Sequence, residues 1–260
     1  MQPRVLILRA PGSNCDREAA FAFETADARA DLVHLNRLLE KPKLAAEYQI
    51  LCLPGGFSYG DDISAGRIFG NQMRHHLHDD LAAFKAAGKL ILGICNGFQI
   101  LIKSGVLLPD RAEEPAATLT LNESGKFEDR WINLQVAGTK CVFLQGIERM
   151  YLPIAHAEGK FVPRDSATLD RLELSGQLVL RYTNPQSEIP NPKSEIPYPA
   201  NPNGAIANVA GICDETGRVL GLMPHPERHI DPTQHPRWTR EIADRGDGLA
   251  VFENAVKYFR

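Results

Sequence analysis

Apolar and polar positions alternate along the first hundred residues in a pattern that predicts strands and helices in turn. Short continuous apolar runs are typical of buried strands, and apolar residues three or four apart are typical of helices. This βαβ alternation predicts a parallel sheet covered by helices. The expected strands are 4–9, 31–35, 48–56 and 90–94, and the expected helices are 71–88 and 14–26, the latter capped by Ser13 or Asn14.

The pattern changes after about residue 116 to shorter strand-like runs. Two of these runs flank 214–217, which predicts a β-hairpin. Leu249, Phe252, Val256 and Phe259 are spaced three or four apart and predict a C-terminal helix. We expect an α/β fold, a three-layer α/β/α sandwich with a mostly parallel, doubly wound sheet and an additional antiparallel region, in a single domain over 1–260. The expected later strands are 117–121, 130–136, 177–182, 205–214 and 218–225.

One stretch is repetitive and rich in proline. The sequence "NPQSEIP" at 184–190 is followed directly by "NPKSEIP" at 191–197, identical in six of seven positions. A period of seven can indicate a coiled coil, but proline at this density is incompatible with a helix. We therefore expect an extended surface loop at about 184–203.

Charge and cysteine content narrow the functional classes. Lys and Arg number 29 against 32 Asp and Glu, a net charge of −3, which is not the basic excess typical of nucleic-acid binding. The five cysteines are scattered and never form a C-x-x-C pair. This pattern argues against a disulfide framework or a zinc site and predicts a cytoplasmic protein. We see neither a signal peptide nor an apolar span long enough to cross a bilayer.

The stretch "LILGICNGFQILIKSG" at 90–105 is the first candidate for chemistry. An apolar strand ends at Cys95 and a helix begins at once, with small residues at Gly93 and Gly97. Such a junction places its apex residue in a tight turn, the geometry that presents a nucleophile. Taken alone, a cysteine in an apolar run is more often a small core residue without a catalytic role.

Two further motifs complement this turn. In "PHPE", His225 lies between prolines, and Glu227 two residues later points the same way in an extended backbone. A carboxylate beside an imidazole fixes its tautomer and stabilises its charged form. In "LPGGFSYGDD", Gly55 and Gly56 follow a strand end, where free amides could hold a developing oxyanion. The three motifs together predict acyl transfer by a Cys-His-Glu set.

Other candidates for a site are weaker. His75, His76 and His78 are close in sequence, but their spacing does not suit metal binding on one helix face. The sequence also lacks a phosphate-binding loop, since the lysines that follow a glycine precede Leu or Phe rather than Ser or Thr. We therefore expect neither a resident metal nor a nucleotide cofactor.

The three motifs together resemble those of class I glutamine amidotransferases, whose fold is flavodoxin-like. The closer resemblance is to the family of glutaminase subunits of phosphoribosylformylglycinamidine synthase, and it runs from about residue 4 to 259. The stretches "FSYGDD" and "NPNG" with "NVAGIC" are the most specific for that family. The others are "LRAPGSNCDRE", "GICNGFQIL", "PIAHAEGKF" and "LMPHPER".

The resemblance implies a role for each matching residue. Cys95 would be the nucleophile, His225 the base and Glu227 its orienting partner. The backbone of Gly56 and Asn96 would form the oxyanion hole. The remaining residues implied to hold the glutamine substrate are Gly55, Gln99 and Gly159.

The resemblance also implies partners. Ammonia released from glutamine would pass to a synthetase subunit that binds ATP and Mg and acts on formylglycinamide ribonucleotide, with a small bridging subunit in the same complex. Three alternatives stay open at this point. The chain could serve another amidotransferase, it could be a cysteine-elbow chaperone or protease of the same architecture, or it could be a catalytically silent regulatory module.

Overall fold

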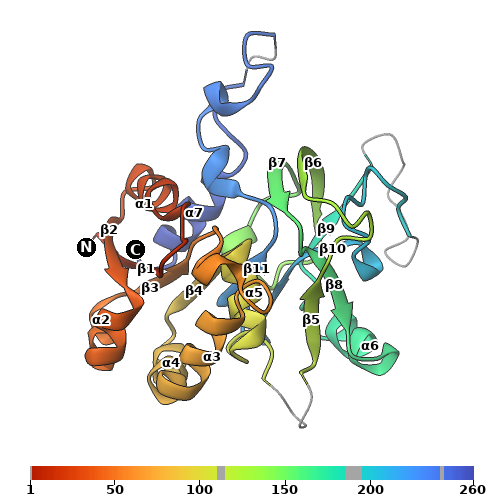
Figure 1. The fold of residues 1–260 in the computed structure, drawn as a ribbon. Coiled ribbons are helices and arrows are strands. Elements are labelled where there is room, and N and C mark those ends of the chain that lie inside the picture. The colour runs from red at the N-terminus through yellow and green to blue at the C-terminus, as the bar shows by residue number, and fades with distance from the viewer. Residues whose placement is uncertain (1, 110–114, 185–194, 241–242) are drawn as a thin grey trace.

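A nine-stranded mixed sheet forms the centre of the protein in the computed structural model, which describes residues 2–109, 115–184, 195–240 and 243–260 (Figure 1). A separate two-stranded antiparallel ribbon pairs β5 (Ala117–Thr120) with β8 (Lys160–Pro163). In spatial order the strands of the large sheet are β2 (Arg29–His34), β1 (Arg4–Arg9), β3 (Ile50–Leu53), β4 (Leu90–Ile94), β11 (Val219–Leu222), β10 (Val209–Cys213), β9 (Leu180–Tyr182), β6 (Glu128–Val136) and β7 (Arg149–His156).

The first five strands of this order are parallel. Every residue of β3, β4 and β11 is buried, as expected where helices cover both faces of a parallel sheet. The chain moves outward from β1 to β2 and then crosses to β3 on the other side, so the winding direction reverses between β1 and β3. Loops at the carboxyl ends of strands beside such a switch point are where ligands bind in open α/β sheets.

Helices pack on the sheet in two groups, one that contains α1 and α7 and another that contains α3 and α5. The Phe23 and Phe252 rings, 4.9 Å apart in an edge-to-face contact, join α1 to α7. The α5 helix packs on β4 and β11 and also contacts α3. The α-helices are α1 (Asp16–Thr25), α2 (Leu35–Glu40), α3 (Arg67–His76), α4 (His78–Ala86), α5 (Asn96–Lys103), α6 (Ser166–Leu174) and α7 (Leu249–Lys257). The 3₁₀ helices are η1 (Pro42–Glu47), η2 (Ser58–Asp61), η3 (Val142–Leu144), η4 (Ile206–Asn208), η5 (Pro226–Arg228) and η6 (Pro232–Gln234).

The expected fold class is confirmed, since helices pack around a parallel sheet that continues into antiparallel strands. The expected hairpin is also confirmed. Strands β10 and β11 pair antiparallel, and the turn between them ends at Gly217, whose φ is +73°.

Several expected boundaries were wrong. The first helix begins at Asp16 rather than at residue 14, and Cys15, not Ser13 or Asn14, precedes it. The predicted helix 71–88 is two helices, α3 and α4, separated at Leu77 (φ −124°, ψ 6°). The strand predicted at 205–214 begins only at Val209, because Ala207 before it has a φ of +53°.

Other features lay beyond the sequence pattern. Strands β7 and β8 and helix α6 were not predicted as elements. Most of the duplicated segment at 184–197 lies outside the described residues. Among the helices that the structure describes, none combines the length and the apolar character needed to cross a membrane.

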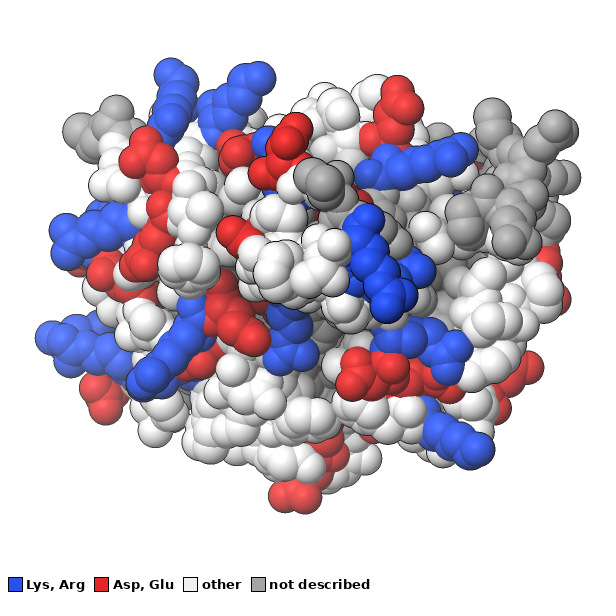
Figure 2. All heavy atoms as spheres, turned by 90° about the horizontal axis from the view of Figure 1, so that it is seen from above, with Lys and Arg blue, Asp and Glu red and all other residues white. Residues whose placement is uncertain are grey.

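The charged side chains are mixed in sign over the face that Figure 2 shows. Lys and Arg lie beside Asp and Glu across this face rather than gathering into one patch of either sign. This distribution agrees with the small net charge of −3.

Candidate active site

Cys95 lies at the sharp junction between β4 and α5, as the sequence predicted. Its φ of 52° and ψ of −106° are outside the regions that non-glycine residues normally adopt. Its amide donates to Leu222 O over 2.8 Å, which fastens the junction to β11. The small neighbours have the expected use, because a Cβ added at Gly93 would lie only 2.6 Å from Gly97 O. Cys95 therefore occupies a strained strand-to-helix turn of the kind that holds nucleophiles.

His225 and Glu227 form a buried hydrogen-bonded pair directly after β11, the strand next to β4. His225 Nδ1 lies 2.7 Å from Glu227 Oε1, and the His225 amide donates to Pro153 O over 2.9 Å. Burial opposes a charge on the imidazole. The Glu227 carboxylate and the Cys95 thiol outweigh it and raise the pKa of His225 well above its ordinary 6.5. The pair therefore favours an imidazolium, whose ring lies near both Cys15 and Cys95. Among the described residues, His225 Nε2 has no hydrogen-bond partner.

Gly55 brings the loop after β3 against this pair. A Cβ added at Gly55 would lie 2.8 Å from His225 Cε1 and 3.5 Å from Cys95 Cβ, so only a glycine fits. Gly56 has a φ of +140°, and a Cβ there would lie 2.6 Å from Gly12 O. Of the predicted oxyanion turn, Gly55 thus lies against His225, and Gly56 lies against the loop after β1.

The other predicted residues form a chain of hydrogen bonds that leads away from Cys95. The Asn96 backbone amide opens α5 and so has no partner within the helix. Asn96 Nδ2 donates to Gln99 Oε1 (3.0 Å), and Gln99 Nε2 donates to Glu158 O (2.5 Å). Gly159 follows, but its own N–H and C=O are bonded to Asn122 and to Asn203. The Gly159 N–H is therefore already used, and its C=O keeps one lone pair for a further donor.

Sequence reasoning missed two residues beside the base. Cys15, after β1, interacts with the His225 ring, and Arg228 Nη2 donates to Cys15 Sγ over 3.2 Å. Burial raises the pKa of the Cys15 thiol above its ordinary 9.0, although the nearby His225 opposes this rise. Cys15 therefore stays a neutral thiol near pH 7. No local sequence signal marks it, because its proximity depends on β1 lying beside β3.

Cys15, His225 and Glu227 also have ligand atoms within 4.8 Å of one another. In the part of the chain that the structure describes, this is the one such group of His, Cys and carboxylate side chains. The group includes His225 and Glu227, which are hydrogen-bonded to each other. A metal ion bound here would compete with that hydrogen bond. His75, His76 and His78 do not form such a group.

The loop after Gly56 is strained and carries an unusual carboxyl group. Tyr59, Asp61 and Ile63 all have positive φ values, between 55° and 71°. Burial and the nearby Glu158 raise the pKa of Asp61 to about 6, although Lys103 opposes this rise. Asp61 Oδ1 accepts from Asn96 Nδ2 (3.3 Å), which connects this loop to the start of α5.

Asp61 should make stability fall with rising pH. The folded protein holds the Asp61 proton up to about pH 6, whereas the unfolded chain releases it near the ordinary value of 3.8. The unfolded state then binds fewer protons between these values, so the free energy of unfolding falls as pH rises from about 4 to 6. Asp61→Asn keeps the acceptor for Asn96 and removes this loss. Melting temperatures of both proteins from pH 4 to 7.5 test it, with the exposed Asp62→Asn as the matched control. Parallel curves for wild type and Asp61→Asn would contradict the expectation.

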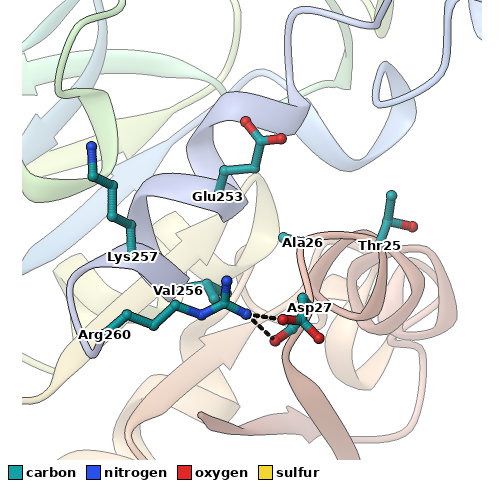
Figure 3. A pocket seen from close by; sticks show the side chains of 7 residues that line it. All are labelled: Thr25, Ala26, Asp27, Glu253, Val256, Lys257 and Arg260. Atoms are coloured by element: carbon teal, nitrogen blue, oxygen red, sulfur yellow. Dashed lines mark hydrogen bonds and ion pairs between the residues drawn. The ribbon is translucent and has the colours of Figure 1, made fainter. Parts of the chain in front are cut away.

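A hollow of about 380 Å³ lies elsewhere, between the end of α1 and α7 (Figure 3). Arg260 and Asp27 form an ion pair at its rim. Cys15 precedes the other end of α1, about 15 Å away at 1.5 Å per residue. The hollow takes no residue from the candidate site. It is lined by Thr25, Ala26, Asp27, Glu253, Val256, Lys257 and Arg260.

Comparisons with known proteins agree with this geometry. The profile of the CobB/CobQ-like glutamine amidotransferase domain matches residues 2–259. A phosphoribosylformylglycinamidine synthase subunit PurQ from Dehalococcoides mccartyi is 48% identical over 99% of this chain and 98% of its own length. One from Methanococcus maripaludis is 42% identical over 99% of this chain and 97% of its own length.

A solved structure extends the likeness to three dimensions. A chain of the PurLQS structure from Thermotoga maritima aligns with a TM-score of 0.74 and 33% identity, and the match covers 100% of both chains. The family that the sequence motifs indicated is thereby confirmed. The chain belongs to the glutamine amidotransferases and, within them, to the PurQ subunits of phosphoribosylformylglycinamidine synthase.

Proposed function

We propose that this chain hydrolyses glutamine to glutamate and ammonia and delivers the ammonia to a synthetase subunit that converts formylglycinamide ribonucleotide to formylglycinamidine ribonucleotide in purine biosynthesis. The observation that carries the proposal is the strained Cys95 beside the His225–Glu227 pair, in which His225 Nδ1 lies 2.7 Å from Glu227 Oε1. The names of the relatives support the choice of acceptor.

The site supports a two-step acyl transfer. The Cys95 thiolate, stabilised by the His225 imidazolium, attacks the side-chain carboxamide of glutamine. The amides of Gly56 and Asn96 hold the oxyanion of the tetrahedral intermediate. His225 protonates the departing ammonia and then takes a proton from the water that cleaves the glutamyl thioester. Glu227 keeps the proton of His225 on Nδ1, so that Nε2 faces the reacting atoms.

In the chain alone, the proposed active site is shielded from solvent. Cys95 is only 5% exposed and His225 only 2%. The strained loop that follows Gly56 carries apolar side chains into solvent. Ile63 is 87% exposed, and Phe57 stacks on Phe127 with both rings about half exposed. A partner that covers these side chains could rearrange the loop and open the site, and such a surface would suit the synthetase subunit.

Docking should therefore activate the enzyme. We expect a low glutaminase rate for the chain alone and a rise of about 10²–10³-fold with synthetase, ATP and formylglycinamide ribonucleotide, which is the rate effect of one organised oxyanion donor. A steady-state assay of glutamate release, with each component omitted in turn, measures it. Full activity in the isolated chain, unchanged by every addition, would favour a free-standing glutaminase.

The proposal assigns the remaining components to the partner. ATP and Mg act on the synthetase subunit, and this half-reaction uses no cofactor of its own. A small bridging subunit in the same complex and a cytoplasmic location complete the proposal. Ammonia handed over without release to solvent would prevent wasteful loss of glutamine.

A further inference from the structure

A buried polar cluster lies beside residues 155–159, the segment that runs past Cys95. The chemistry proposed above does not use this cluster. We call it the Asn122 cluster, and it consists of Asn122, His156, Tyr182 and Asn203. All four side chains are buried and come from separate parts of the chain. Buried polar groups cost stability unless they are bonded, so such a set calls for an explanation.

Asn122 is hydrogen-bonded to three residues of this segment, His156, Ala157 and Gly159, and also to Lys126. Its backbone amide donates to Ala157 O (2.7 Å), and its Nδ2 donates to His156 O (2.8 Å) and to Lys126 O (2.9 Å). Its Oδ1 accepts from Gly159 N over 3.1 Å. The reverse amide orientation is excluded, because it would place an oxygen against two carbonyls and an NH₂ against an N–H.

This orientation fixes the tautomer of His156. His156 Nδ1 also lies 3.1 Å from Asn122 Oδ1, and an amide oxygen only accepts hydrogen bonds. Nδ1 therefore carries the ring proton and Nε2 the lone pair. Burial and the positive charge at His225 lower the pKa of His156 to about 3. The ring is therefore neutral, in this one tautomer, near neutral pH.

Gly159 also packs directly against the His156 ring. A Cβ added at Gly159 would lie 2.7 Å from Nε2 and overlap the neighbouring ring atoms. Above the ring, Gly159 O accepts from Asn203 Nδ2 (2.7 Å), which also donates to Tyr182 OH (3.0 Å). Both polar groups and one face of Gly159 are thus fixed by buried side chains.

The segment held in this way borders the nucleophile. Cys95 Sγ lies 3.7 Å from Ala155 O, and Gln99 Nε2 donates to Glu158 O. We infer that Asn122 and His156 are positioning residues that hold 155–159 as the wall against which glutamine is oriented beside Cys95. This inference rests on the proposed glutaminase function. It predicts that loosening the wall weakens recognition of glutamine without changing the thiol itself.

Two electrophiles separate these effects in the full-length chain assembled with its synthetase subunit, ATP and formylglycinamide ribonucleotide, the state in which the site is expected to be open. The glutamine analogue 6-diazo-5-oxo-norleucine must be recognised before it alkylates Cys95, whereas iodoacetamide needs only access to the thiol. The ratio of the two labelling rates, followed by mass spectrometry, cancels differences in exposure of Cys95. We expect Asn122→Ala and His156→Phe to lower this ratio about tenfold, equivalent to ~1.4 kcal/mol.

Matched variants test the tautomer and a merely structural role. His156→Asn places an N–H where Nδ1 stands and should regain part of the ratio, whereas His156→Gln places its amide near Nε2 and should not. His229 is also buried, donates from Nδ1 to Tyr151 O (2.9 Å) and packs on Trp131. His229→Phe should lower the melting temperature and leave the ratio within about twofold.

The outcomes are distinguishable. Ratios within twofold of wild type in both Asn122→Ala and His156→Phe, with the wild-type chain labelled normally at Cys95, would overturn the inference alone. A wild-type chain that iodoacetamide labels and the glutamine analogue does not would overturn the proposed function, and the inference with it.

Discussion

Cys95→Ala is expected to abolish glutamine hydrolysis, by about 10⁴-fold or more, because no thioester can form without the nucleophile. The fold should survive, since alanine tolerates the turn no worse than cysteine does. We expect a change in melting temperature of a few degrees, which corresponds to about 1 kcal/mol in a protein of this size. Assays use the complex with its synthetase, where we expect the highest activity.

Two comparisons sharpen this test. Cys95→Gly should be more stable than Cys95→Ala by about 1 kcal/mol, because glycine relieves the positive φ of 52°. Cys15→Ala is the matched thiol control and should keep most of the activity. In wild type, a glutamine-like electrophile should label Cys95 and spare the other four cysteines, because all five are buried and only Cys95 stands at the proposed glutamine site. A label found mainly on Cys15 or Cys213 would refute the assignment.

Gly97→Ala is expected to cause the largest loss of stability. Its Cβ would lie 2.7 Å from the carbonyl carbon of Leu53 and overlap the oxygen, so the first turn of α5 would have to leave the end of β3. Overpacking of this kind costs about 1–3 kcal/mol and sometimes more, and backbone cannot move aside as a side chain can. The same displacement would separate Cys95 from Gly55 and remove activity in any protein that still folds.

Gly105→Ala provides the control. Gly105 follows the same helix and has a φ of +75°, but a Cβ there meets nothing within 4 Å. Its substitution should cost only the backbone strain, about 1–2 kcal/mol, and leave the site intact. Urea unfolding of both variants and glutaminase assays of the folded proteins measure the difference. Equal losses of stability and activity would show that close approach of α5 to β3 is not what Gly97 provides.

The sequence was most informative where chemistry depends on local order. Cys95 between an apolar strand and a helix, and His225 two residues before Glu227, could be recognised because neighbours in the chain decide their geometry. The substrate roles of Gly56, Asn96, Gln99 and Gly159 stay predictions, as does the single domain. The division at Leu77 was missed because the helical pattern of apolar residues continues across it.

The rest of the site depends on contacts between distant segments. Cys15 reaches His225 only because β1 lies beside β3, and Asn122 reaches His156 only through the placement of β7. Cys15 falls within the helix predicted at 14–26 and Asn122 follows the strand predicted at 117–121, and neither position carries a motif that indicates its contact. Hydrogen-bonded clusters of this type become visible only once the strand order is known.

The position of β11 has a consequence for how the protein is made. The strand lies between β4 and β10 and joins the parallel half of the sheet to the antiparallel half, yet among the strands that the structure describes it comes last in the chain. Until it arrives, β4 has an unpaired edge that other chains can pair with, which is a hazard for aggregation during synthesis. Its arrival closes that edge and also delivers His225 to Cys95. In the nascent chain, the closing of this edge and the approach of His225 to Cys95 therefore take place in the same step.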